Sequence, residues 1–165
     1  MSTRCQVRVI QIGLSWEESI TLYHHTDGYP EYMVPLIYKA MMEHIEYHDN
    51  YPYMIKGEKG KLRWQAGRAG KVASRLCATD PEVFEPEVGH DLHNDIDYYY
   101  KLYVVNKLVF DNEIIWELEV LTTTPKFWEE SEGKEENLEI LHERQPLSQL
   151  IEKYYKDYKI YFERE

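Results

Sequence analysis

Four stretches of the chain alternate between apolar and polar residues with a period of two, which is the pattern of β-strands. They are residues 5–12, 20–25, 95–105 and 114–121. A short connection separates the first stretch from the second, and another separates the third from the fourth. The pattern therefore predicts two β-hairpins.

Three other stretches repeat apolar residues at intervals of three and four, which is typical of helices with one buried face. They are residues 30–47, 70–78 and 146–158. Asp27-Gly28 ends the preceding strand with a turn signal, and Pro30 suits the first helical position because its missing N–H costs nothing there. Pro35 conflicts with the helical pattern, so we expect the regular part of the first helix to begin near Val34.

Two segments lack a clear period. We expect residues 82–94 to form a loop. We expect the acid-rich residues 129–143 to form an exposed linker with some helix. The order of the remaining elements indicates an α+β fold, with a mostly antiparallel sheet built from two hairpins and helices on one face. At 165 residues, the chain is expected to form a single domain.

Composition narrows the classes of function. The net charge of −11 argues against a general nucleic-acid binder of the basic kind. Two cysteines, Cys5 and Cys77, are too few for a disulfide scaffold or a four-cysteine zinc module. The sequence has no apolar run of about 18 residues and no signal-peptide pattern. We therefore expect a cytoplasmic protein that makes no membrane contact.

The charge is unevenly distributed along the chain. Between Lys56 and Arg75, seven basic residues accompany one acid, so this segment carries +6 and the remainder carries −17. The segment also holds four of the eight glycines, which allow backbone N–H groups to approach an anion. It is interpreted either as a solvated basic loop or as a contact for phosphate, nucleic acid or an acidic partner, with Arg63 and Arg68 as ligand-binding candidates.

The first candidate site lies where the second strand leads into the first helix. A helix N-terminus favours an anionic ligand, and a histidine beside a carboxylate can act as a general base. His25 and Asp27 are therefore the catalytic candidates, and Arg4 and Tyr29 are ligand-binding candidates. In the structural alternative, Asp27 caps the helix and Gly28 supplies a positive φ for the turn.

The second candidate site is residues 90–97, which contain two histidines and three acids. On a strand, His93 and Asp95 point the same way about 6.6 Å apart, so they are further ligand-binding candidates. A metal ion bound by His90, Asp91 and His93, together with His25, is the alternative to a polar surface loop. We expect the surface loop, with no metal and no cofactor.

The first predicted helix carries two histidines near its end. His44 and His48 lie one turn apart and therefore on one face. A zinc protease requires Glu where this chain has Ile45, so the spacing favours a helix end that reaches solvent over a metal site.

One motif is similar to that of a known family. The motif His-x-Asp-Gly-Tyr-Pro is formed by His25, Asp27, Gly28, Tyr29 and Pro30, and it is preceded by Ser2-Thr3-Arg4. Both features resemble a family of small, uncharacterised proteins of bacteria, archaea, phages and plasmids. Residues 93–98 look like a later His-Gly-Asp-Ile-Glu-Tyr stretch of that family, with Asn94 in place of Gly and Asp97 in place of Glu. The resemblance covers about the first 50 residues and 93–120, and it implies a shared fold and carriage on mobile elements but no reaction.

The sequence leaves three functions open. We expect a binding or accessory module, encoded by a virus or mobile element, that recognises an anionic ligand or a macromolecular partner. The first alternative is a small hydrolytic or phosphate-processing enzyme that uses His25, Asp27 and Arg4. The second is an acidic inhibitor that imitates nucleic acid, because the chain outside the basic segment carries −17.

Overall fold

The computed structural model describes residues 2–49, 66–107, 113–129 and 133–163. The strands are β1 (Cys5–Ile12), β2 (Ser19–His24), β3 (Phe84–Pro86), β4 (Tyr98–Lys107), β5 (Glu113–Thr122) and β6 (Glu139–Pro146). The helices are α1 (Pro30–Asp49), α3 (Ala69–Thr79), α4 (Pro125–Glu129), α5 (Leu147–Leu150) and α6 (Tyr155–Tyr161), with short 3₁₀ segments η1 (Glu135–Asn137) and η2 (Ile151–Tyr154).

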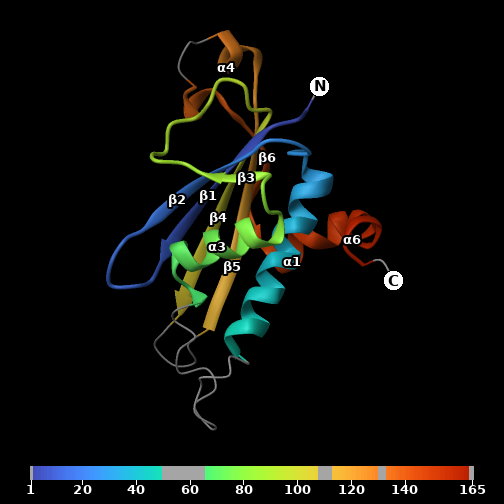
Figure 1. The fold of residues 1–165 in the computed structure, drawn as a ribbon. Coiled ribbons are helices and arrows are strands. Elements are labelled where there is room, and N and C mark those ends of the chain that lie inside the picture. The colour runs from blue at the N-terminus through green and yellow to red at the C-terminus, as the bar shows by residue number, and fades with distance from the viewer. Residues whose placement is uncertain (1, 50–65, 108–112, 130–132, 164–165) are drawn as a thin grey trace.

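The strands form one six-stranded sheet in the order β3-β2-β1-β4-β5-β6 (Figure 1). All neighbours are antiparallel except β1 and β4, which run parallel with Cys5 opposite Tyr98. The two predicted hairpins are β1–β2 and β4–β5, and this parallel pair joins them at the centre of the sheet. The α+β prediction with a mostly antiparallel sheet is confirmed.

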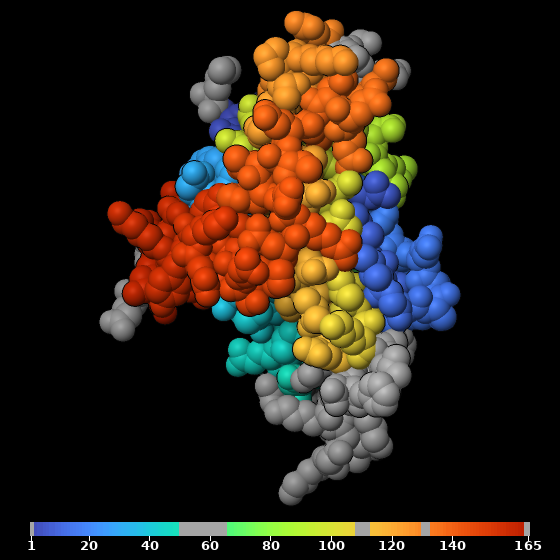
Figure 2. Space-filling view, turned by 180° about the vertical axis from the view of Figure 1, so that it is seen from behind, coloured from blue at the N-terminus to red at the C-terminus, as the bar shows by residue number. Residues whose placement is uncertain are grey.

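The longer helices pack on one face of the sheet, and α6 lies against α1 (Figure 1). Side chains from the strands and helices meet there in the main core, whose fully buried members include Val7, Leu22, Leu102, Leu118, Met33, Ile37, Val72 and Leu150. A smaller apolar cluster on the opposite face is formed around Tyr23, Tyr99 and Phe127. Elsewhere on that face, parts of β1, β4 and β5 reach the surface (Figure 2). None of the helices in the described parts of the chain is both long and apolar enough to cross a membrane.

Four expectations about local structure are corrected. The predicted loop at 82–94 contains the short edge strand β3. The predicted linker at 129–143 ends in β6, where Val120 of β5 pairs with His142. Most of β6 is exposed, so neither of its faces shows the apolar alternation that marks a strand. The first helix begins at Pro30 and includes Pro35, and the C-terminal helix is divided into α5, η2 and α6.

The β1–β2 hairpin fixes the start of α3. The amide oxygen of Gln11 accepts a hydrogen bond from the Ala69 N–H (2.9 Å), and the carboxylate of Glu18 accepts one from the Gly70 N–H (2.8 Å). Arg68, at the N-cap position, makes no side-chain capping bond. Two donors of the first turn are therefore satisfied by side chains from the hairpin.

We expect Glu18→Ala to lower the free energy of unfolding by about 1 kcal/mol, because it removes a charged acceptor from a helix N-terminus. The measurement is urea unfolding followed by circular dichroism. Glu17→Ala is the matched control, since Glu17 is an exposed neighbour that carries the same charge. Equal stability of the two variants would show that the contact between Glu18 and α3 contributes nothing.

Candidate functional site

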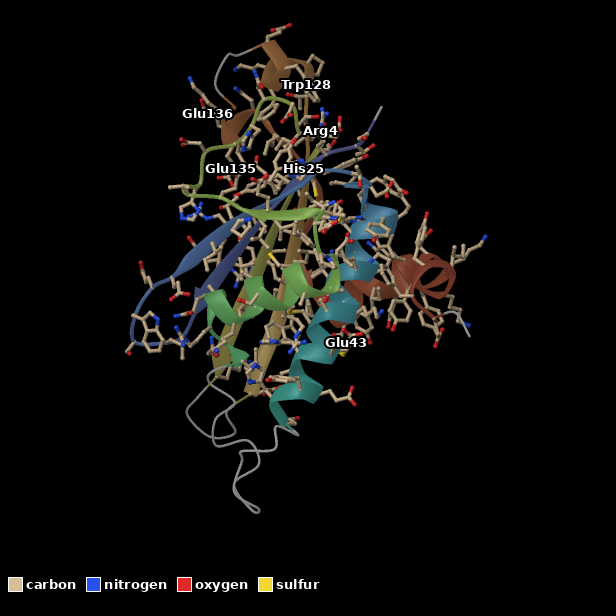
Figure 3. All side chains as sticks on the ribbon, in the orientation of Figure 1. Arg4, His25, Glu43, Trp128, Glu135 and Glu136 are labelled. Carbon is tan, nitrogen blue, oxygen red and sulfur yellow. The ribbon has the colours of Figure 1, made fainter. Side chains whose placement is uncertain are left out.

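Four of the residues selected from the sequence gather around Tyr23, on the sheet face opposite the long helices. The Tyr23 hydroxyl donates to Asp95 (3.0 Å), and Asp95 also pairs with Arg4 (3.8 Å). The rings of His25 and His93 both contact the Tyr23 ring edge-on, at centroid distances of 4.6 and 4.8 Å. Figure 3 shows Arg4 and His25 at the same end of the sheet.

The electrostatics of this cluster do not suit an anionic ligand. The His25 imidazole pairs with Glu85 at 2.9 Å, and the His93 imidazole pairs with Glu87. The cluster thus contains three carboxylates and one permanent cation, Arg4. These side chains are mostly half-exposed, so each ion pair contributes at most about 1 kcal/mol to stability.

Asp27 and Tyr29 interact with each other and with Tyr161 of α6. The Tyr29 hydroxyl is hydrogen-bonded to Tyr161 and to Asp27, which raises the pKa of Tyr29. Asp27 has a positive φ of 52°, and it therefore takes the turn conformation that was expected of Gly28. The structure pairs His25 with Glu85 instead of Asp27.

Gly28 is required for a different reason. Its N–H donates to the carbonyl of Thr3 (2.9 Å), and a Cβ at this position would lie 2.9 Å from backbone atoms of Arg4 and Cys5. The turn that follows β2 therefore packs directly on the start of β1, and only glycine leaves room for that contact.

The loop that carries the second candidate site is held by Gln6 and by hydroxyl groups. Gln6 donates to the carbonyl of Asp91 and accepts from the His93 N–H, while His90 bonds to Ser19 and Thr21. Within the described ranges, no three His, Cys, Asp or Glu side chains are placed to bind a metal ion together.

A second site lies between the last turns of α1 and the middle of α3, in a pocket of about 430 Å³. Its polar walls are His44, Tyr47 and His48 from α1 and Lys71, Ser74 and Arg75 from α3. Among the residues that the structure describes, none that lines the pocket is Asp or Glu. In a chain of net charge −11, this is a local concentration of positive charge.

The described part of the basic segment singled out in the sequence contributes to this pocket at its end. Arg63 lies outside the described residues, together with Lys56, Lys59 and Lys61. Arg68 is half-buried and immediately precedes α3. Of the described cations, Lys71 and Arg75 line the pocket, and they lie one helical turn apart on α3.

His44 and His48 are buried, which corrects the expectation that this helix end reaches solvent. The Nε2–H of His44 donates to the Ala66 carbonyl (2.9 Å), and its Nδ1 accepts from Nε–H of Arg75 (3.5 Å). Burial lowers the pKa of His44 to about 4, and burial also lowers the pKa of His48. The charges of Arg75 and Lys71 also lower the pKa of both rings and outweigh the smaller opposing effect of Asp49 on His48, which indicates a positive potential in the pocket.

The sequence contained the signals for this pocket in two separate places. His44 and His48 repeat at four, and so do Lys71 and Arg75. Each pair marks one helix face. Neither pattern shows that the two faces meet, because contact between α1 and α3 is a tertiary property.

Comparison with protein families, with curated proteins and with solved structures finds no match for this chain. The chemistry of the two sites is therefore the basis for assigning a function.

Proposed function

We propose that the protein is a binding module for an anionic ligand, and that the pocket between α1 and α3 is its binding site. The observation that carries the proposal is the lining of this pocket, in which Lys71 and Arg75 supply two positive charges and no described lining residue supplies a negative one. A concave site with a few convergent polar groups is the usual form of a ligand site.

The distribution of charge supports this choice over the cluster around Tyr23. In that cluster, Arg4 already pairs with Asp95, and both imidazoles pair with glutamates. An anion placed there would approach three carboxylates. In the pocket, His44 and His48 are neutral at pH 7, so the cationic side chains determine the potential.

The enzyme alternative receives less support. It requires His25 to act as a base oriented by Asp27 or Asp95. In the structure, the imidazole of His25 bonds to Glu85, Asp27 bonds to Tyr29, and Asp95 bonds to Tyr23 and Arg4. The nucleic-acid mimic remains an alternative based on net charge alone.

The proposal includes a reducing, cytoplasmic location, supported by the free thiols of Cys5 and Cys77. It also includes an origin on a virus or mobile element, supported by the resemblance at residues 25–30.

A thermal-shift panel of small carboxylates, sulfates and phosphates tests the proposal. A ligand at one hundred times its Kd stabilises the folded protein by about 2.7 kcal/mol, so we expect at least one anion to raise Tm by several degrees. The double variant Lys71→Gln/Arg75→Gln should lose that response.

The matched control is Lys126→Gln/Lys156→Gln, which removes the same charge from exposed positions on α4 and α6. We expect this control to keep the response of the wild type. A wild-type protein that no anion stabilises, or a response that survives in the pocket variant, would overturn the proposal.

A further inference from the structure

The pocket presents a donor set that suits an anion with several acceptor oxygens. Lys71, Ser74 and Arg75 occupy positions i, i+3 and i+4 of α3, so their side chains share one face. The ammonium and guanidinium groups together offer donors in several directions, whereas the Ser74 hydroxyl donates to the Gly70 carbonyl (2.9 Å). Guanidinium groups in particular match the oxygens of phosphate through parallel hydrogen bonds.

Arg75 is held in a defined orientation. Its Nε–H donates to His44, and its guanidinium lies over the Tyr47 ring, with the carbon Cζ 4.8 Å from the ring centroid. The two terminal nitrogens of the guanidinium carry four other N–H donors. Fixing the group before binding reduces the entropy that a ligand contact costs. His44 is therefore a positioning residue for Arg75.

The number of charges on the described lining residues indicates the charge of the ligand. Lys71 and Arg75 carry two positive charges, and the neighbouring imidazoles of His44 and His48 are neutral near pH 7. A phosphate monoester carries a charge of about −1.5 to −2 at this pH, which matches two cations. A carboxylate, a sulfate ester or a phosphodiester carries only one negative charge.

The size of the pocket indicates that the phosphate belongs to a larger molecule. Ligand sites for small organic compounds begin at about 300 Å³, and this pocket measures about 430 Å³. Phosphate alone would occupy the part beside Lys71 and Arg75. Ala78 and the carbon atoms of the Tyr47 ring also line the pocket and offer apolar surface to an organic group.

We infer that the α1–α3 pocket binds the phosphate monoester of a small organic molecule. This inference rests on the proposed anion-binding function and specifies the class of ligand.

Calorimetric titration at pH 7.5 with phenyl phosphate, phenyl sulfate and inorganic phosphate tests the inference. Phenyl phosphate and phenyl sulfate have similar shapes and differ in charge. The comparison of the two ligands therefore tests the effect of charge on the wild-type protein, without a variant. We expect phenyl phosphate to bind at least tenfold more tightly than phenyl sulfate, because it carries the second negative charge. We also expect it to bind at least tenfold more tightly than inorganic phosphate, because its ring contacts the apolar wall.

Variants then locate the site. Arg75→Gln should weaken phenyl phosphate binding at least tenfold, and Arg75→Lys should restore part of it because the charge is kept while the paired donors are lost. Lys126→Gln, with the same charge change on α4, should leave the affinity unchanged. Circular dichroism shows whether each variant is folded.

Four results separate this inference from the proposed function. Equal affinity for the two esters would overturn the assignment of the ligand as a phosphate monoester. Equal affinity for phenyl phosphate and inorganic phosphate would overturn the claim that the pocket binds the organic part of the ligand. Tighter binding of a single-stranded oligonucleotide without a terminal phosphate would assign the pocket to nucleic acid instead. Each of these three results leaves the proposed anion-binding function in place, as long as the pocket variant Lys71→Gln/Arg75→Gln abolishes binding. If no anion binds at all, both the inference and the proposed function are overturned.

Discussion

Gly67→Ala is expected to destabilise the protein by about 3 kcal/mol, because a Cβ at this position would lie 1.6 Å from the side-chain oxygen of Asn106. Asn106 cannot move aside without cost. It is buried, and its amide nitrogen donates to the carbonyls of Ile12 and Gly67, both at 3.0 Å. A shift of Asn106 would break these bonds inside the core. The change is measured as the free energy of urea unfolding.

Gly89→Ala is the matched control, because no atom lies within 4 Å of a Cβ placed there. It should change stability by less than about 0.5 kcal/mol. A further test places Gly67→Ala in the Asn106→Ala background, where the substitution should cost much less because the clashing side chain is gone. Similar losses from Gly67→Ala and Gly89→Ala would contradict the contact.

Apolar alternation predicted those strands that have one face against the helices. β4 and β5 show this most clearly, since Leu102 and Leu118 are fully buried while their neighbours along the strand are half-exposed. β6 has no comparable signal, because Ile140 and Leu141 are both exposed. The parallel pairing of β1 with β4 also left no local signal, since it joins residues more than 90 positions apart.

The candidate sites show the same limit. The sequence selected His25 correctly as a residue of a polar cluster, yet its partner Glu85 lies 60 positions away on an edge strand that the pattern did not predict. It also grouped Asp27 with His25 because they are close in sequence. The pocket depends on a contact between α1 and α3. In the sequence, each helix showed only a pair of polar residues four positions apart, which marks one face of that helix. Local patterns therefore identified faces, and tertiary packing determined which faces meet.

Lowering the pH from 7 to 4 is expected to cost the protein about 3 kcal/mol through His44 alone. Burial lowers the pKa of His44 from 6.5 to about 4, so between these values the unfolded chain binds a proton that the folded protein does not. This stability is fully present above pH 6.5 and is lost as the pH falls through 4. Each pKa unit corresponds to about 1.4 kcal/mol.

His44→Gln isolates this contribution, because the glutamine amide can still donate to the Ala66 carbonyl but does not titrate. The difference in unfolding free energy between wild type and variant, measured in urea at several pH values, should change by about 3 kcal/mol between pH 7 and pH 4 in favour of the variant. NMR titration of the His44 ring should give a pKa near 4. If the unfolding free energies of wild type and His44→Gln changed in parallel with pH, the result would contradict the claim that the His44 imidazole is buried and neutral. They would also remove the reason for expecting Nδ1 of His44 to hold Arg75, since a charged imidazole has no lone pair left to accept that bond.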